Sequence, residues 1–213
     1  MGTLVIMARY PELGRVKSRL AAELGAPAAR DLYRAFLDDL AARFVGGPIP
    51  VVWMFHPPDR DFAALLPSGA DCQPQHGANL GERMHEAFRR LANCAPLIMI
   101  GTDSPHIRSA WIVEAEQRLG DHDVVLGPCD DGGYYLIAMN HPHDVFSGIV
   151  MGTSHVCAQT IEKAARQGLR VHLLPSSFDI DAGKDVRALQ RQLDSDPDAP
   201  RLPATLAVLA RLR

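Results

Sequence analysis

The fold is decided by the stretch at residues 96–105, which reads PLIMIGTDSP. Its apolar run, rich in isoleucine and leucine, predicts a buried strand of a parallel sheet, and the turn sequence GTDSP ends that strand before a helical pattern from Arg108. Ligands of open α/β sheets bind beyond the carboxyl ends of the strands, so Asp103 falls where such a fold does its chemistry. The alternative is that Asp103 or Ser104 caps the following helix.

The rest of the chain repeats this alternation of strand and helix. Apolar runs predict further strands at residues 3–8, 51–55, 72–74, 123–128, 134–138 and 170–174. Helical patterns lie at residues 15–25, 28–44, 80–91, 111–119, 155–167, 184–193 and 204–213, and a short helix is expected at 61–66. This order predicts an α/β fold, a three-layer α/β/α sandwich around a mostly parallel sheet. We expect one domain over residues 1–213, in which residues 194–213 form a linker and a C-terminal helix.

The composition is that of an ordinary globular chain. Of its 213 residues, 47% are hydrophobic and 22% are charged, and the formal net charge is −3. Lysine and arginine form no basic stripe, so we expect no nucleic-acid partner, and no apolar run reaches the length of a membrane span. The four cysteines form no Cys-x-x-Cys pair, which argues against a zinc site or a disulfide framework. No signal peptide is evident at the start, so the cytoplasm is the expected compartment.

The loop after the first strand carries three cations, Arg15, Lys17 and Arg19. Guanidinium and ammonium groups at the start of a helix are suited to holding phosphate oxygens. The loop is not a Walker A motif, because the Gly-Lys-Ser/Thr ending is absent. A solvated basic helix start is the alternative, but cations are unfavourable at the positive end of a helix dipole, which favours an anionic ligand.

A second segment that could face a ligand lies at residues 75–84. Gln75 offers both a donor and an acceptor to a base edge, and Gly77 and Gly81 would let the backbone approach a ligand closely. A plain loop followed by a helix cap is the alternative for this segment.

Carboxylates follow two later strands. Asp131 precedes a pair of glycines, so it belongs either to a hairpin turn or to a site where it acts as a catalytic or acceptor-binding carboxylate. Asp179 and Asp181 occupy alternate positions, which places them on one face if the segment is extended. Paired carboxylate oxygens suit Mg²⁺ or Mn²⁺.

Five blocks stand in order along the chain: PELGRVKSRL at 11–20, QHGANLGERM at 75–84, GTDSP at 101–105, DGGYYL at 131–136 and FDID at 178–181. On these blocks the chain resembles small bacterial proteins of the GT-A, nucleotide-diphospho-sugar transferase type, which are related to guanylyl- and cytidylyltransferases. The resemblance runs from about Ile6 to Leu189. It implies a nucleotide bound across the ends of the first strands, with Mg²⁺ or Mn²⁺ bridging its phosphates.

The resemblance also implies roles for individual residues. The implied nucleotide-binding residues are Arg15, Lys17 and Arg19 for the phosphates, Gln75, Gly77 and Gly81 for the nucleobase, and Asp103. Asp103 matches the metal aspartate, and Asp179 or Asp181 matches the second acidic position. Asp131 matches the acidic residue of the family that lies near the acceptor substrate. Asp131 and Lys17 are therefore the expected catalytic groups.

The chain departs from the family pattern at several positions. Asn79 stands where aspartate is common, and Asp130 replaces a common glutamate. Residues 182–184, Ala-Gly-Lys, replace a usual Thr-Pro-Glu, which removes a helix-start signal and weakens the metal assignment of the acids before it. Met151 sits where tryptophan is usual, so the acceptor pocket is expected to differ in shape.

The implied function is metal-dependent glycosyl transfer from a nucleotide sugar to an acceptor, in which a nucleoside diphosphate leaves the anomeric carbon. The alternative is nucleotidyl transfer, in which the α-phosphorus of a nucleoside triphosphate is attacked and pyrophosphate leaves. In either reaction a metal at Asp103 would neutralise phosphate charge, and Lys17 and the arginines would stabilise the leaving group. A nucleotide-binding regulator without catalysis is the third hypothesis.

Overall fold

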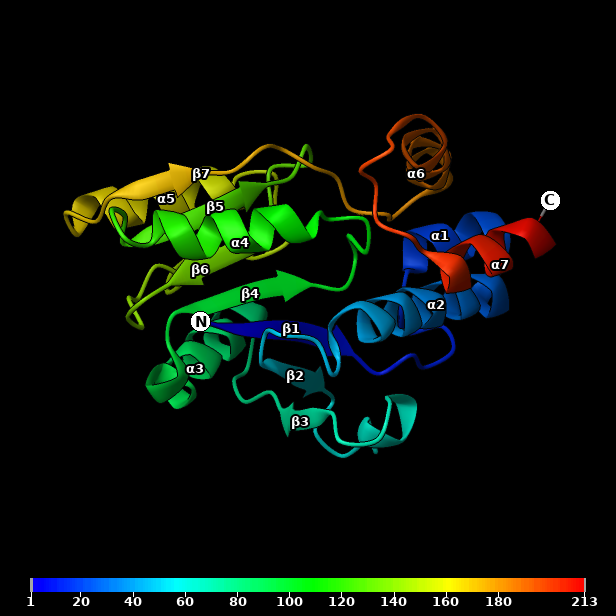
Figure 1. The fold of residues 1–213 in the computed structure, drawn as a ribbon, viewed down its shortest axis with the longest axis horizontal. Coiled ribbons are helices and arrows are strands. Elements are labelled where there is room, and N and C mark those ends of the chain that lie inside the picture. Colours follow the sequence, from blue (N-terminus) through cyan, green and yellow to red (C-terminus); the bar gives the residue numbers. More distant parts are fainter. Residues whose placement is uncertain (1, 213) are drawn as a thin grey trace.

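The computed structural model describes residues 2–212, and a seven-stranded sheet lies at its centre (Figure 1). The strands are β1 (Thr3–Arg9), β2 (Val51–His56), β3 (Asp71–Pro74), β4 (Leu97–Gly101), β5 (Val124–Pro128), β6 (Tyr134–Met139) and β7 (Val171–Leu173). Their order across the sheet is β3-β2-β1-β4-β6-β5-β7. Only β6 runs antiparallel to its neighbours, β4 and β5. The sheet is therefore mostly parallel, as predicted.

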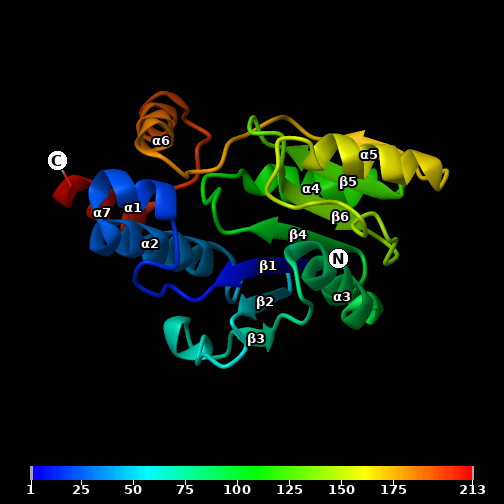
Figure 2. The same cartoon turned by 180° about the vertical axis from the view of Figure 1, so that it is seen from behind.

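Helices cover both faces of the sheet, which confirms the three-layer architecture. The four that pack on it are α2 (Ala26–Phe44), α3 (Leu80–Arg90), α4 (Ser109–Arg118) and α5 (Val156–Arg166). One face carries α2 and α4, and the opposite face carries α3 and α5 (Figures 1 and 2). In β4, Ile98 and Ile100 enter the core under α2 and α4, whereas Leu97 and Met99 enter the other core. The continuous apolar run thus belongs to a strand that is buried on both faces.

Three more helices form a group beside α2, beyond the edge of the sheet (Figure 1). They are α1 (Ser18–Leu24), α6 (Gly183–Ser195) and α7 (Pro203–Arg211). The buried carboxylate of Asp39 on α2 accepts hydrogen bonds from the backbone N–H groups of Ala204 and Thr205, at 2.9 and 2.8 Å. The predicted C-terminal helix is therefore attached to α2 at its first turn. Its predicted last residue, Arg213, lies outside the described residues.

Most predicted element boundaries agree with the structure to within a few residues, and two helices differ in kind or extent. The helix predicted from Arg15 begins only at Ser18, because Lys17 adopts a left-handed conformation with φ of 51°. The short helix predicted at 61–66 is a single 3₁₀ turn at Ala63–Leu65 (η1). Among the described residues, no helix has both the length and the apolar character that a membrane span requires.

The direction of the strands decides where a ligand can bind. The six strands other than β6 all end at one edge of the sheet, and β6 begins there. The segments that leave this edge hold Lys17, Asp103, Asp131 and Asp179. Residues from distant parts of the chain are thereby brought to one place, as expected for an open α/β sheet.

Candidate functional site

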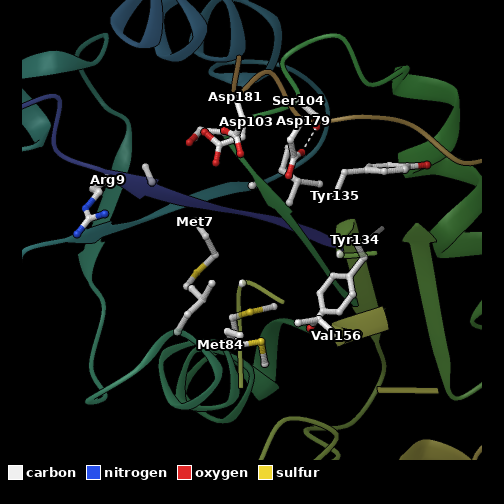
Figure 3. A pocket seen from close by; sticks show the side chains of 18 of the residues that line it. Met7, Arg9, Met84, Asp103, Ser104, Tyr134, Tyr135, Val156, Asp179 and Asp181 are labelled. Atoms are coloured by element: carbon white, nitrogen blue, oxygen red, sulfur yellow. Dashed lines mark hydrogen bonds between the residues drawn. The ribbon is translucent and has the colours of Figure 1, made fainter. Parts of the chain in front are cut away.

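A cavity of about 540 Å³ opens at the carboxyl edge of the sheet. The ends of β1, β2 and β4, the beginnings of α1 and α3, and the segments around β6 and after β7 line it. Carboxylates from Asp103, Asp179 and Asp181 gather on one side, and the side chains of Met7 and Met84 lie away from them (Figure 3). The cavity therefore combines a charged side with an apolar floor.

Lys17 is buried at the charged side of this cavity. Its Nζ lies 2.6 Å from Asp103 Oδ1 and 3.0 Å from Asp181 Oδ1, while the Lys17 side chain is only 3% exposed. Burial alone would lower the pKa of Lys17, but the two carboxylates outweigh this effect and raise the pKa. The side chain is therefore a fixed ammonium ion. The two carboxylates remain accessible, with side-chain exposures of 47% for Asp103 and 36% for Asp181.

Asp179 lies deeper and has different partners. Its Oδ1 accepts a hydrogen bond from Ser104 Oγ at 2.5 Å (Figure 3). The same oxygen lies 3.5 Å from Cys129 Sγ. Burial and the nearby charge of Asp103 raise the pKa of Asp179 to about 6. Ser104 Oγ also lies 2.9 Å from the carbonyl oxygen of Phe178, so the two acceptors share its one hydroxyl hydrogen. Ser104 thus joins the turn after β4 to the segment after β7.

The alternative that Asp103 or Ser104 caps the following helix is wrong. The N-cap of α4 is Arg108, and the Ser104 hydroxyl is within hydrogen-bond distance of the distant residues Phe178 and Asp179. The turn at residues 101–105 is consequently used to build the cavity wall.

The oxygen atoms on the charged side fit a hard divalent cation. Asp103 and Asp181 present partly exposed carboxylates to the cavity, and Mg²⁺ and Mn²⁺ prefer such ligands. A second group, Cys129, Asp131 and Asp179, has ligand atoms within 4.8 Å of one another. Burial and the neighbouring aspartates raise the pKa of the Cys129 thiol, so it stays protonated and is a poor ligand for these ions. Of the side chains gathered here, the carboxylates are the ones whose chemistry would suit such an ion.

Asp131 lies at the wall of the cavity in the turn between β5 and β6. Its side chain is exposed, and its Oδ1 accepts a hydrogen bond from the backbone N–H of Gly133 at 2.9 Å. The turn hypothesis and the site hypothesis are therefore compatible, because the same carboxylate shapes the turn and faces the cavity.

The three predicted phosphate-binding cations are not equivalent. Arg19 lines the cavity, is 74% exposed and lies 3.6 Å from Asp181. Arg15 is exposed and does not line the cavity. It sits in a turn in which its backbone N–H donates to the carbonyl of Glu12, ahead of the helix. The structure thus brings Lys17 and Arg19, but not Arg15, to the site.

The segment predicted to face a nucleobase is only partly at the cavity. Gln75 lines it, but the side chain is 5% exposed and its Nε2 donates to the carbonyls of Ala8 and Met54, at 3.1 and 2.7 Å. Gly77 and Gly81 do not line the cavity. A Cβ atom on Gly77 would lie 2.7 Å from the backbone nitrogen of Arg83, and one on Gly81 would lie 3.0 Å from Met151. These glycines are therefore explained by packing around the start of α3.

Four further residues line the cavity without belonging to any predicted binding set: Tyr33, Arg9, His56 and Arg83. The Tyr33 hydroxyl accepts from the Arg9 backbone N–H at 2.9 Å and lies 3.0 Å from Thr102 Oγ1, so it links the ends of β1 and β4. Burial and the charge of Asp103 raise the pKa of Tyr33 to about 12, which keeps it a neutral phenol. The helical pattern around Tyr33 is typical of a core residue, and no local sequence signal indicates that it links β1 to β4.

A seven-stranded α/β sheet with this polar cavity at its carboxyl edge has the fold of the nucleotide-diphospho-sugar transferases. The structure of a "putative nucleotide-diphospho-sugar transferase" from Desulfovibrio desulfuricans G20 matches with a TM-score of 0.88 and 30% sequence identity, over 99% of this chain and 95% of that chain. Residues 40–153 match the family described as "Uncharacterized protein conserved in bacteria (DUF2064)". The chain belongs to this family.

More distant structures share the fold at lower identity. CMP:2-keto-3-deoxy-manno-octonic acid synthetase complexed with CTP matches with a TM-score of 0.51 and 14% identity, over 90% of this chain and 98% of that chain. A cytidylyltransferase from Leptospira borgpetersenii serovar Hardjo-bovis matches with a TM-score of 0.55 and 13% identity, over 98% of this chain and 93% of that chain. No curated protein matches the sequence.

Proposed function

We propose that this protein is a nucleotide-dependent transferase that moves a glycosyl group from a nucleotide sugar to an acceptor with the help of a divalent metal. One observation carries the proposal: the Lys17 ammonium lies between Asp103 and Asp181 at the wall of the cavity. A buried cation and accessible carboxylate oxygens stand side by side, and a metal-bound diphosphate requires both. The 30% identity to the Desulfovibrio protein supports a sugar nucleotide as the donor.

Lys17 and Arg19 are the groups that would bind the donor's phosphates. The pKa of Lys17 is raised, so its ammonium stays charged at neutral pH. Because Asp103 and Asp181 fix the buried ammonium in place, its charge would act on a diphosphate in the cavity from a fixed position. Arg19 adds a second, exposed cation at the same wall. Both would stabilise the negative charge that develops on the leaving diphosphate.

Asp103 and Asp181, with Asp179 beside them, would hold Mg²⁺ or Mn²⁺, and the bound ion would neutralise the charge of the phosphates. The raised pKa of Asp179 supports this proposal, because the charge of Asp103 contributes to it. Lys17 pairs with Asp103 and Asp181, and Arg19 lies 3.6 Å from Asp181. The charge of Lys17 also offsets part of the rise in the pKa of Asp179. A bound divalent cation would supply additional positive charge to these three carboxylates.

Asp131 is the proposed general base. The backbone N–H of Gly133 donates a hydrogen bond to Asp131 Oδ1. Asp131 Oδ2 is therefore left to take the proton from a hydroxyl of the acceptor substrate. The acceptor oxygen would then form the bond to the anomeric carbon while the bond from that carbon to the phosphate oxygen breaks. The electron pair leaves with the nucleoside diphosphate, and the proton stays on Asp131.

Nucleotidyl transfer is the second candidate function, and the likeness to cytidylyltransferases favours it. The same cations would then stabilise pyrophosphate leaving the α-phosphorus of a nucleoside triphosphate. The two reactions differ in their products, which an experiment can separate.

The test is a thermal-shift panel of nucleotide sugars and nucleoside di- and triphosphates, each with Mn²⁺, with Mg²⁺ and with EDTA. Ligands that bind the native state raise the melting temperature. A metal-dependent shift with a nucleotide sugar, together with slow release of the nucleoside diphosphate, would support glycosyl transfer. Release of pyrophosphate from a triphosphate would favour nucleotidyl transfer instead. Binding without turnover in the presence of varied acceptors would indicate a regulator, and no shift at all would overturn the proposal.

A further inference from the structure

A second group of cations lines the same cavity away from Lys17. Arg9 ends β1, His56 ends β2 and Arg83 lies in α3, and all three face the cavity. Arg9 lies apart from the carboxylates of Asp103 and Asp181 (Figure 3). We refer to Arg9, His56 and Arg83 as the basic cluster.

The members of the basic cluster are close enough to repel one another. Burial lowers the pKa of Arg83, and the charge of Arg9 lowers it further. Burial likewise lowers the pKa of His56, followed by the charges of Arg83 and Arg9. Positive groups that share a small volume need a counter-charge.

The described residues supply no such counter-charge at bonding distance. Neither Arg9 nor Arg83 forms an ion pair within residues 2–212. The nearest acid in sequence, Glu82, is used at the start of α3, where its carboxylate accepts from the Ala78 backbone N–H and from Asn79 Nδ2. The cations are therefore left for a group that enters from the cavity.

Two atoms of the basic cluster are also buried without a partner. Arg83 Nε and His56 Nδ1 have no hydrogen-bond partner in the part of the chain that the structure describes. A buried polar atom that lacks a partner is costly, and the structure keeps both atoms beside a cavity that other atoms of the same side chains line.

We infer that the basic cluster is an anion subsite, which binds a phosphate or carboxylate group of a substrate separately from the diphosphate at Lys17. Arginine binds such oxyanions through paired N–H groups, and His56 adds a ring nitrogen. The inference deepens the proposed function, because it gives the substrates a second negative group. That group belongs either to the nucleotide or to the acceptor.

The first experiment uses inorganic phosphate alone, in EDTA and without nucleotide. Phosphate titrated into the native protein should move the His56 imidazole NMR signals in a saturable way. Arg9→Ala and Arg83→Ala should each weaken the affinity for phosphate by about tenfold, the usual scale for losing a charge-assisted hydrogen bond. Arg90→Ala is the control, because Arg90 is an exposed residue of the same helix. Arg9 is itself exposed, so its removal is compatible with folding.

The outcome against the inference is a His56 signal that does not respond to phosphate, or an affinity that is the same in native protein, Arg9→Ala and Arg83→Ala. This arm does not depend on nucleotide binding, so the proposed function can fail while the subsite stands. A second arm repeats the titration with a saturating nucleotide from the thermal-shift panel. Loss of the phosphate response would assign the anion to the nucleotide, and an intact response would assign it to the acceptor. Either result supports the subsite.

Discussion

Lys17 Nζ lies 2.6 Å from Asp103 Oδ1, and this contact joins the loop after the first strand to the turn after the fourth. The left-handed backbone at Lys17, with φ of 51°, turns the chain just before α1. A non-glycine residue in this conformation is uncommon and marks a position that the surroundings hold in place. The ion pair therefore fixes a cation at the site instead of leaving it in solvent.

The phosphate role of Lys17 predicts a selective loss of affinity. Lys17→Ala should weaken the binding of a nucleoside diphosphate by at least about tenfold and the binding of the free nucleoside by less than about twofold. The reason is that the ammonium interacts with phosphates and not with the base. Isothermal titration calorimetry measures both affinities. Lys184→Ala, at an exposed lysine at the start of α6, is the control. Equal losses for the two ligands would remove the phosphate role.

Folding stability should fall in acid because of His106. This residue is fully buried, its Nε2 lies 3.2 Å from Ser177 Oγ, and burial together with the charge of Arg43 lowers its pKa to about 4. An unfolded histidine has its pKa near 6.5, so below that pH the unfolded state binds a proton that the folded state does not. The His106 contribution to the free energy of unfolding should therefore drop by up to about 3 kcal/mol as the pH falls from about 6.5 to 4. Asp179, whose pKa is raised to about 6, binds a proton in the folded state and contributes in the opposite direction over part of this range.

Urea unfolding at a series of pH values checks this prediction. Between pH 6.5 and 4 the free energy of unfolding should change by up to about 3 kcal/mol less favourably in native protein than in His106→Gln. The contributions of His56 and Asp179 cancel in this comparison because both proteins contain them. The same pH dependence in native protein and variant would show that His106 is not the responsible group.

The attachment of α7 to α2 rests on Asp39, and its removal should be costly. Asp39→Ala leaves the backbone N–H groups of Ala204 and Thr205 without their acceptors, so we expect a loss of about 2 kcal/mol in the free energy of unfolding. Asp38→Ala removes only a partly exposed pair with Arg34 and should cost less than about 0.5 kcal/mol. Chemical denaturation compares the two. Similar losses would mean that the helix is held mainly by its apolar side chains.

Gly132 is expected to be irreplaceable in the turn beside Asp131. A Cβ atom there would lie 2.0 Å from the carbonyl oxygen of Ser154, and the φ of Gly132 is 89°. Gly132→Ala should therefore destabilise the protein by more than about 2 kcal/mol. Gly148→Ala also has a positive φ, of 81°, but no atom within 4 Å, so it separates backbone strain from the clash. Equal melting temperatures for the two variants would contradict this packing.

Most of the fold follows from the sequence because each strand is a short apolar run that ends in turn residues. The run at residues 97–100 is buried on both faces, and a strand inside a parallel sheet needs such an uninterrupted apolar surface. The start of α1 could not be predicted in the same way. Its boundary depends on the left-handed backbone of Lys17, whose side-chain partner Asp181 is 164 residues away.

Site residues that directly follow a strand can be predicted from the sequence. Residues whose role depends on their neighbours in the folded chain are harder to predict. Asp103, Asp131 and Asp179 were identified because they leave the carboxyl edge of the sheet. The sequence suggests that Gly77 lets the backbone approach a ligand, but the atoms that exclude a side chain at this position belong to α3. Arg9 directly follows the predicted strand at residues 3–8, so the same signal could have indicated it, whereas Arg83 reaches the cavity wall from α3 through tertiary structure.

The most direct measurement is the affinity of the nucleotide found in the thermal-shift panel for native protein and for Asp103→Asn, each with Mn²⁺ and with EDTA. Asparagine keeps the size of the side chain and removes its charge, and Asp103 is partly exposed, so the variant should fold. We predict that Mn²⁺ strengthens binding to the native protein by at least about tenfold and has little effect on the variant. An equal metal effect in both proteins would contradict a metal-bound nucleotide at Asp103.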